Sequence, residues 1–342
     1  MRIQGGMIFV SALCACAEVT AAQEPAFHTL RSDALVAEIV PEWGGRLMFL
    51  GKPGGKNALW TNPSAATNDA VKVWCNIGGE KTWVGTMETW KGFNGGGEAP
   101  HWPPPIWFDS APLEVVRANE TNMLLRSGFH MSGNWTVALE REFTLAEDRL
   151  EVREKLWDCS QIANVHKSQV NTNDNCNLSF VNNDAHLPFV NNDDRRRVWS
   201  VTQIPLVDIV EARLAGEGRT EYFGNCPPLS SRDSTGWSKL DLSGAPQHAR
   251  VAFDGDALAA AIPGVGRLVI EQTADEKHLS AFATPSRAIV YTTGKDFASS
   301  KWTGWCREPY IELEFVALGP DAEQILTFRI ESEDENRKER NQ

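Results

Sequence analysis

Residues 113–157, LEVVRANETNMLLRSGFHMSGNWTVALEREFTLAEDRLEVREKLW, decide the fold class of this chain. Within them, Trp135, Val137 and Leu139 alternate with Thr, Ala and Glu, which is the period of a half-buried β-strand. Turn formers such as Asn, Gly, Ser and Asp separate successive runs. Four runs have the length of a strand, at residues 113–117, 123–130, 135–143 and 150–157. The stretch therefore predicts consecutive β-strands.

The rest of the chain repeats this rhythm, and it lacks amphipathic helices of a dozen residues. Further strand-length runs lie at residues 34–40, 46–50, 197–204, 250–253, 258–262, 267–272, 288–293, 310–316 and 325–331. Many short strands in a chain of 342 residues indicate a large sandwich or barrel. We therefore predict an all-β fold.

The composition narrows the class of ligand. An apolar share of 42% and a charged share of 23% are ordinary for a soluble globular protein. A formal net charge of −12 disfavours nucleic acid and anionic membranes as partners. The sequence has no P-loop and no G-x-G-x-x-G after a strand, which disfavours a nucleotide-dependent enzyme. The charge is compatible with a sugar ligand, and we expect no cofactor.

Residues 1–22 have the features of an export signal: a basic start, an apolar core at residues 7–19 and small residues before a cleavage site. The apolar core is too short to span a bilayer. We therefore expect an exported protein, periplasmic or extracellular, without a membrane span. As an alternative, residues 13–16, LCAC, resemble a lipobox, which would place a lipid anchor on Cys16.

We expect residues 23–331 to form one domain, followed by a charged, disordered tail at residues 332–342. Residues 160–196 form a polar insertion, and residues 217–238 form a second polar loop. The alternating Asn residues of the insertion resemble a calcium loop, but Cys176 stands where that loop needs glycine, so we predict no metal site. Four of the five cysteines left after cleavage could pair, in an order that the sequence leaves open: Cys75, Cys159, Cys176, Cys226 and Cys306.

Residues 74–107 hold five of the thirteen tryptophans, a glycine cluster and three consecutive prolines. Glycine weakens strands and helices and proline removes a backbone donor, so we expect a long, shaped loop. Five indole rings argue against disorder. The segment is either an aromatic-walled site or a structural loop held by its tryptophans. Its polar candidates are Glu80, Lys81, Glu88, Glu98 and His101.

Residues 40–46, VPEWGGR, resemble the opening motif of the galactose mutarotase-like superfamily, which includes the aldose 1-epimerases. Other stretches resemble an exported branch of it, the DUF4380-type proteins: GGEKTW at 78–83, WPP at 102–104, WSVTQ at 199–203 and YIELE at 310–314. The resemblance covers residues 30–331. It implies a β-supersandwich of two large twisted antiparallel sheets, with a concave face that binds a mono- or oligosaccharide.

The resemblance also implies a glutamate base late in the chain and a histidine acid on a central strand. Tyr310, Glu312 and Glu314 alternate, so they share one face of a strand. We favour Glu314 over Glu312 as the base because it lies nearer the downstream proline. Two buried carboxylates on one face would raise the pKa of one of them. The alternative is a solvated edge strand with its acidic side in water.

The histidine acid that the resemblance implies has no counterpart in this sequence, because the matching residues 199–203 contain no histidine. His166 and His186 lie in the polar insertion. His101, in the tryptophan-rich segment, is the remaining candidate acid. This departure favours binding without catalysis.

Sugar binding needs flat aromatic faces and polar groups that fix hydroxyls. The aromatic candidates are Trp83, Trp90, Trp102 and Trp107. Besides Glu314, the polar candidates are Arg46, Glu80, Lys81 and Gln203. Arg46 could equally be the partner of a buried carboxylate.

Three functions therefore stay open. The first is an exported carbohydrate-binding protein that acts as an isomerase, an epimerase at the anomeric carbon. The second is a non-catalytic glycan-binding protein on the same scaffold. The third is a polysaccharide lyase or a glycoside hydrolase accessory. The sequence does not indicate the sugar or the oligomeric state.

Overall fold

The computed structural model describes residues 25–62, 76–96, 102–132, 135–158, 197–215, 219–223, 226–245, 248–273, 287–295, 308–318 and 322–332. The export signal expected at residues 1–22, the candidate anchor Cys16, the insertion at 160–196 and His101 lie outside the described residues. They stay predictions, as does the charged tail beyond residue 332. Of the five cysteines the structure describes one, Cys226, which is a free thiol. Within the described ranges, no helix is long and apolar enough to cross a membrane.

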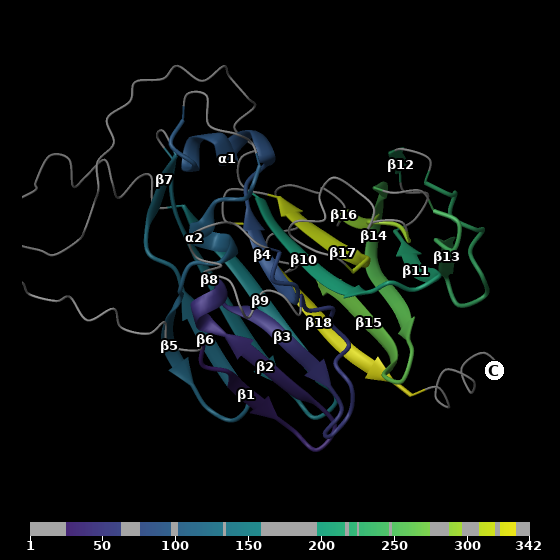
Figure 1. Cartoon of the computed structure of the whole chain (residues 1–342), viewed down its shortest axis with the longest axis horizontal. Helices are drawn as coiled ribbons and strands as arrows, with labels where there is room; N and C mark the ends of the chain where they lie inside the picture. Colours follow the sequence, from purple (N-terminus) through teal and green to yellow (C-terminus); the bar gives the residue numbers. More distant parts are fainter. Residues whose placement is uncertain are drawn as a thin grey trace, which may run out of the picture.

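Antiparallel strands make up nearly all of the described chain (Figure 1). The strands are β1 (His28–Arg31), β2 (Val36–Val40), β3 (Arg46–Gly51), β4 (Glu80–Val84), β5 (Glu114–Ala118), β6 (Asn122–Arg126), β7 (His130–Ser132), β8 (Trp135–Leu145), β9 (Arg149–Asp158), β10 (Arg197–Pro205), β11 (Ile209–Leu214), β12 (Thr220–Phe223), β13 (Trp237–Asp241), β14 (Ala249–Ile262), β15 (Gly266–Thr273), β16 (Arg287–Thr292), β17 (Tyr310–Leu318) and β18 (Glu323–Glu331). The helices are short: η1 (Pro41–Trp43), α1 (Met87–Phe93) and α2 (Ile106–Asp109).

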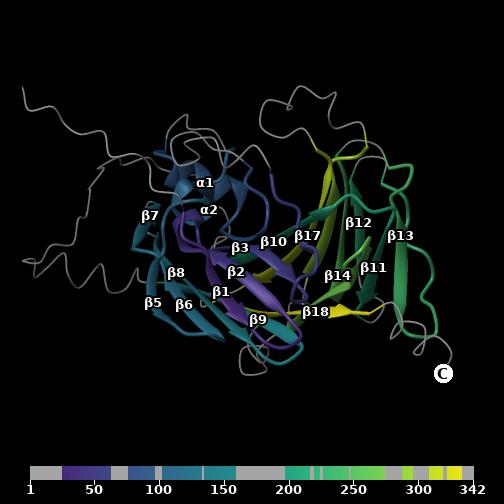
Figure 2. The ribbon, with the colours of Figure 1, turned by 60° about the horizontal axis from the view of Figure 1, so that its bottom comes forward.

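The strands form two large antiparallel sheets that face each other. We call the first sheet I, with the strand order β1-β2-β3-β4-β10-β17-β16-β14-β12. Sheet II has the order β5-β6-β8-β9-β18-β15-β14-β11-β13, and β7 extends the β6 edge of β8. Helices α1 and α2 lie at one end of the sandwich, beside β7 and β4 (Figures 1 and 2). These sheets confirm the predicted all-β sandwich.

The long strand β14 belongs to both sheets. Its first half pairs with β16 and β12 in sheet I, and its second half pairs with β15 and β11 in sheet II. Gly255 lies at the change of sheet, where a Cβ atom would stand 2.7 Å from the carbonyl oxygen of Arg213. The partner strand shifts register at the same point. The two separate runs predicted at 250–253 and 258–262 are thus one strand, bent where glycine permits a close backbone approach.

The core lies between the sheets and takes alternate side chains from both. Leu313 and Phe315 of β17 point inward from sheet I, and Leu326 and Phe328 of β18 point inward from sheet II. All four are fully buried in one apolar cluster. Burial of one face of each strand is the two-residue alternation that the sequence predicts.

A network of buried polar side chains also joins the two sheets. Arg141 of sheet II donates to both carboxylate oxygens of Glu80 in sheet I, at 2.7 and 2.5 Å, and Arg141 Nη2 lies 3.3 Å from Glu154. Ser200 and Gln324 donate to Glu80 and Glu154, respectively. Burial, and secondarily the charge of Glu80, raise the pKa of Glu154 to about 8. The raised pKa favours the protonated form of Glu154, and in that form Arg141 and Glu80 are a matched pair of charges.

The segment 74–107 is not the irregular loop that its composition predicts. Its described part contains β4, helix α1 and the start of α2. Strand β4 forms because it pairs with β10 over five residues. Helix α1 begins with a capping box, in which Thr86 and Thr89 bond each other's backbone N–H groups. Tertiary pairing and a cap thus outweigh the glycines and prolines around them.

Strands also form in segments where the sequence predicts none. Short strand β12 and the start of β13 lie within the expected polar loop at residues 217–238. Strand β11, at residues 209–214, pairs with both β13 and β14. Long-range pairing with β14 stabilises β11 and β12, pairing with β11 stabilises β13, and neither leaves a local pattern in the sequence.

We expect Arg141→Met to lower the free energy of unfolding by about 3–5 kcal/mol, because it leaves the buried Glu80 carboxylate without its cation. Urea denaturation measures the loss. The matched control is Arg117→Met, whose side chain is 58% exposed and pairs with Glu142, and which should cost less than about 1 kcal/mol. Equal losses in the two variants would contradict a structural role for the buried pair.

Candidate functional site

The candidate site lies on the outer face of sheet I, around strand β17. Alternation along β17 puts Glu312 and Glu314 on this face, while Leu313 and Phe315 point into the core. Strand β17 pairs with β10 on one side and β16 on the other. It is therefore an internal strand, and the alternative of a solvated edge strand does not apply. Glu314 is only 2% exposed.

The strand register brings side chains from four strands onto the same face. Glu314 is paired with Val201 of β10, which is paired in turn with Lys81 of β4. Glu312 is paired with Gln203 of β10 and with Tyr291 of β16. Directly paired residues point to the same side of a sheet. The predicted residues Lys81, Gln203, Glu312 and Glu314 are thus brought together.

Glu314 has the properties of a general base. Its carboxylate accepts hydrogen bonds from Trp199 Nε1 at 2.8 Å and from Arg250 Nη2 at 3.0 Å. Burial raises the pKa of Glu314 most, Arg250 opposes the rise, and the charge of Glu312 adds to it, so that the pKa reaches about 7. A carboxylate that titrates near neutral pH can both take up and release a proton there.

Glu312 and Lys81 complete the charged centre of the site. Glu312 accepts a hydrogen bond from Gln203 Nε2 at 2.7 Å, and burial raises its pKa. Burial, and next the neighbouring Arg46, lower the pKa of Lys81 to about 8. The Lys81 ammonium lies 4.6 Å from the centre of the Trp83 ring, within cation–π distance.

A tyrosine and a histidine lie on the other side of Glu312. The Tyr291 hydroxyl and His248 Nδ1 are 2.5 Å apart. Burial, together with the charges of Glu312 and Glu314, raises the pKa of Tyr291, so its hydroxyl keeps its proton at neutral pH. The sequence analysis missed this pair. His248 and Tyr291 are 43 residues apart, and only the pairing of β14 with β16 joins them.

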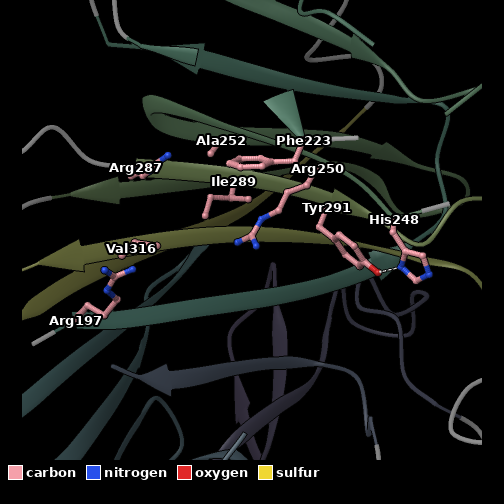
Figure 3. A pocket seen from close by; sticks show the side chains of 9 residues that line it. All are labelled: Arg197, Phe223, His248, Arg250, Ala252, Arg287, Ile289, Tyr291 and Val316. Atoms are coloured by element: carbon pink, nitrogen blue, oxygen red, sulfur yellow. Dashed lines mark hydrogen bonds between the residues drawn. The ribbon is translucent and has the colours of Figure 1, made fainter. Parts of the chain in front are cut away.

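A cavity of about 490 Å³ opens on this face, next to Arg250 and Tyr291 (Figure 3). Two of the lining residues also contact the groups described above. Arg250 binds the Glu314 carboxylate, and the Tyr291 hydroxyl contacts His248. A volume of this size is typical of small-molecule sites. The lining residues are Arg197, Phe223, His248, Arg250, Ala252, Arg287, Ile289, Tyr291 and Val316.

Arg46 and Trp83 both bind a carboxylate that the sequence analysis did not single out, Asp109 at the end of α2. Arg46 Nη2 lies 3.0 Å from Asp109 Oδ1, and Trp83 Nε1 donates to the same oxygen at 2.8 Å. All three side chains are buried. Arg46 is therefore the partner of a buried carboxylate, which is one of the two roles that the sequence predicted for it. It is not exposed to a ligand in this structure.

Glu80 lies on the opposite face of β4 from Lys81. It points between the sheets and is held by Arg141, with no exposed surface. The sequence analysis grouped Glu80 with the ligand-binding residues, and the structure corrects this grouping, because neighbours in a strand point to opposite faces. A ligand on the outer face of sheet I cannot reach Glu80.

The predicted aromatic residues form a packed cluster rather than four separate sugar platforms. Trp90 has no exposed surface, and its Nε1 donates to the carbonyl of Val84. The Trp83 ring meets Trp199 edge to face, with centroids 5.0 Å apart. Trp102 is half-buried and lies 5.8 Å from Trp83. This cluster holds Trp199, and through it Glu314, in place. In the described part of the chain, no group of His, Cys, Asp and Glu is arranged to hold a metal ion.

Neither family models nor curated protein sequences match the chain. Among solved structures, YeaD from Salmonella typhimurium, a proposed mutarotase, aligns with a TM-score of 0.53 at 9% identity, over 89% of this chain and 90% of its own. The Slr1438 protein from Synechocystis sp. PCC 6803 aligns with a TM-score of 0.53 at 11% identity, over 91% of this chain and 97% of its own. At such low identity the likeness concerns the fold. With its two facing antiparallel sheets, the chain has the mutarotase-like β-supersandwich fold.

Proposed function

We propose that this protein binds a carbohydrate on the outer face of sheet I and interconverts its anomers, as an aldose epimerase does. One observation carries the proposal: the buried Glu314 carboxylate, with a pKa of about 7, is bound by Arg250, and Arg250 lines a ligand-sized cavity together with the hydrogen-bonded pair of Tyr291 and His248. The fold shared with YeaD, itself a proposed mutarotase, supports the same reaction class.

Anomer interconversion needs one group that removes a proton and another that supplies one. Glu314 takes the proton of the anomeric hydroxyl as the bond between the anomeric carbon and the ring oxygen breaks. The Tyr291 hydroxyl gives its proton to the ring oxygen, and its hydrogen bond to His248 holds the phenol in place. Rotation of the open-chain aldehyde and reversal of both transfers close the ring as the other anomer. No proton is gained or lost over the cycle.

The remaining polar groups position these reactants. Trp199 and Arg250 fix the Glu314 carboxylate by two hydrogen bonds. Gln203 holds Glu312, which keeps a second carboxylate close to Glu314 and supports the raised pKa of the base. Glu312 and Glu314 belong to one strand and one face, so they do not face each other across a ligand as the two carboxylates of a glycoside hydrolase do.

A binding protein without catalysis is the second candidate. It is favoured by the absence of a histidine from β10, where the resemblance implies one. We also propose, on the sequence motifs alone, that the chain belongs to the exported DUF4380-type branch and is secreted by its N-terminal signal. Detection of the mature protein outside the cytoplasm, cleaved near residue 22, tests the export.

We expect Glu314→Gln to reduce catalysed mutarotation by about 10²–10⁴-fold, because the amide cannot accept the anomeric proton. Polarimetry on a panel of aldoses measures the rate, and tryptophan fluorescence checks that sugar still binds. The matched control is Glu142→Gln, at an exposed pair on sheet II, which should leave the rate unchanged. An active Glu314→Gln variant would remove the proposed base. Saturable binding without turnover in the wild type would establish the binding protein instead.

The rate of mutarotation should fall as the pH drops below about 7, because Glu314 must be ionised to act as the base. Burial raises the pKa of Glu314 above the usual carboxyl range. Trp199→Phe removes a hydrogen bond that lowers the pKa of Glu314, so this variant should move the acid limb to higher pH. A profile of kcat/KM against pH measures both. An acid limb near pH 4 in the wild type would contradict the assignment of Glu314.

Tyr291→Phe should lower kcat by about 10²-fold or more, while sugar binding changes little, because the variant loses the proton donor and keeps the ring. Tyr222→Phe is the control: this tyrosine is 43% exposed and its hydroxyl accepts a bond from the backbone of Leu229. Polarimetry gives kcat and fluorescence titration gives the affinity. Full activity of Tyr291→Phe would mean that another group supplies the proton.

A further inference from the structure

Lys81 is a buried cation that the proposed proton transfers leave unused. Its side chain is 1% exposed, and Lys81 is not among the residues that line the cavity. Burial of an ammonium group costs free energy unless nearby carboxylates compensate its charge. The sequence analysis grouped Lys81 with the ligand-binding residues, but at this burial its charge acts on protein groups.

Within the described part of the chain, a cluster of charged side chains lies at the outer face of sheet I. It holds three cations and three carboxylates: Arg46, Lys81, Arg250, Asp109, Glu312 and Glu314. Two ion pairs account for four of them. Arg46 Nη2 lies 3.0 Å from Asp109 Oδ1, and Arg250 Nη2 lies 3.0 Å from Glu314 Oε2. One ammonium and one carboxylate are left.

The carboxylate left for Lys81 is that of Glu312, and the strand register brings the two together. Lys81 is paired with Val201, which is paired in turn with Glu314. Glu312 lies two positions before Glu314, on the same face of β17. Glu312 is 9% exposed, and it accepts a hydrogen bond from the neutral amide of Gln203. An ionised carboxylate at this burial also needs a cation, and Lys81 supplies one.

The nearby ion pair of Arg46 and Asp109 does not compensate the charge of Lys81. The Lys81 ammonium lies 4.0 Å from Asp109 Oδ1, which is longer than a hydrogen bond. Burial lowers the pKa of Lys81 most, and the further lowering by Arg46 exceeds the rise that Asp109 causes. Glu312 is the carboxylate that raises this pKa next. In turn, burial raises the pKa of Glu312, and the charge of Lys81 is the largest effect that opposes the rise.

We propose that Lys81 is a positioning residue of the site: its ammonium keeps Glu312 ionised, and the ionised Glu312 makes Glu314 a stronger base. The inference rests on the proposed function, in which Glu314 takes the anomeric proton. Two like charges on one buried face of a strand disfavour each other, so each carboxylate binds a proton more readily while the other is ionised. The charge of Glu312 is one of the effects that raise the pKa of Glu314.

Lys81→Met tests the proposal, because methionine has a similar length and no charge. Without the ammonium, Glu312 takes up a proton, its repulsion of Glu314 is lost and the pKa of Glu314 falls. The acid limb of the kcat/KM profile should therefore move to lower pH, by about one unit for the loss of a neighbouring like charge. A purely structural role would lower kcat or stability and leave the limb in place.

The direction of the shift is diagnostic. Removal of a cation ordinarily raises the pKa of a carboxylate, which would move the limb to higher pH. The direct effect of Lys81 on Glu314 is the smaller one here, because Glu312 is among the main causes of the raised pKa of Glu314 and Lys81 is not. A shift to higher pH would show that Lys81 acts on Glu314 without Glu312 and would overturn the proposal.

Glu312→Gln supplies the neutral side chain directly and should move the acid limb in the same direction by a similar amount. The double variant, Lys81→Met with Glu312→Gln, should shift the limb no further than Glu312→Gln alone, since Lys81 acts through Glu312. Additive shifts would contradict this order of action. Glu312→Gln also tests the proposal by itself if Lys81→Met does not fold, and an unmoved limb then overturns it.

Lys155→Met is the matched control. The Lys155 ammonium also lies over an indole, 4.1 Å from the centre of the Trp157 ring, but on strand β9 of sheet II. Its side chain is 27% exposed and pairs with Glu323. This variant should leave the acid limb and kcat unchanged. Circular dichroism verifies that each variant is folded.

A measurement without substrate separates this proposal from the proposed function. Trp199 Nε1 donates to Glu314 at 2.8 Å, so the fluorescence of Trp199 should change when Glu314 takes up a proton. The part of the pH titration that disappears in Trp199→Phe belongs to this residue. Its midpoint should lie at lower pH in Lys81→Met than in the wild type.

The outcomes are distinguishable. A midpoint and an acid limb that both stay at the wild-type pH overturn the role of Lys81 and leave the proposed function standing, even if kcat falls. A lowered midpoint in a protein that catalyses no mutarotation supports the coupling of Lys81, Glu312 and Glu314 and removes the proposed function.

Discussion

The two-residue period of β17, fixed between β10 and β16, is the constraint on which the site depends. It sends Leu313 and Phe315 into the core and turns Glu312 and Glu314 to the outer face. A shift of register by one residue would bury both carboxylates among the apolar side chains, so the core itself enforces the register of the site. Of the residues that hold the carboxylates, Trp199 and Gln203 come from the neighbouring strand β10, and Arg250 comes from β14, on the far side of β16.

Two properties distinguish the candidate base Glu314 from the structural carboxylates: how fully its charge is compensated, and whether a ligand can reach it. Glu80 is held by Arg141, and Asp109 by Arg46, inside the molecule. Glu314 is also buried, but its partner Arg250 is one-third exposed and lines a cavity. A carboxylate with incomplete compensation has a raised pKa, and a carboxylate next to a cavity can use that pKa on a ligand. Glu314 meets both conditions.

The sequence predicted what depends on local pattern and missed what depends on long-range pairing. Alternation revealed most of the strands and the shared face of Glu312 and Glu314. It did not reveal β4, whose partner β10 is more than one hundred residues away, and so Glu80 was grouped with Lys81 although they point to opposite faces. Arg46 had two equal interpretations because its partner, Asp109, lies on a different element. The pairing of Tyr291 with His248 arises only when β14 and β16 come together.

The cavity and Glu314 are electrically linked, because Arg250 lines the cavity and binds the Glu314 carboxylate. At present its charge lowers the pKa of Glu314 and so partly offsets burial. A ligand that contacts Arg250 would therefore also act on the pKa of Glu314.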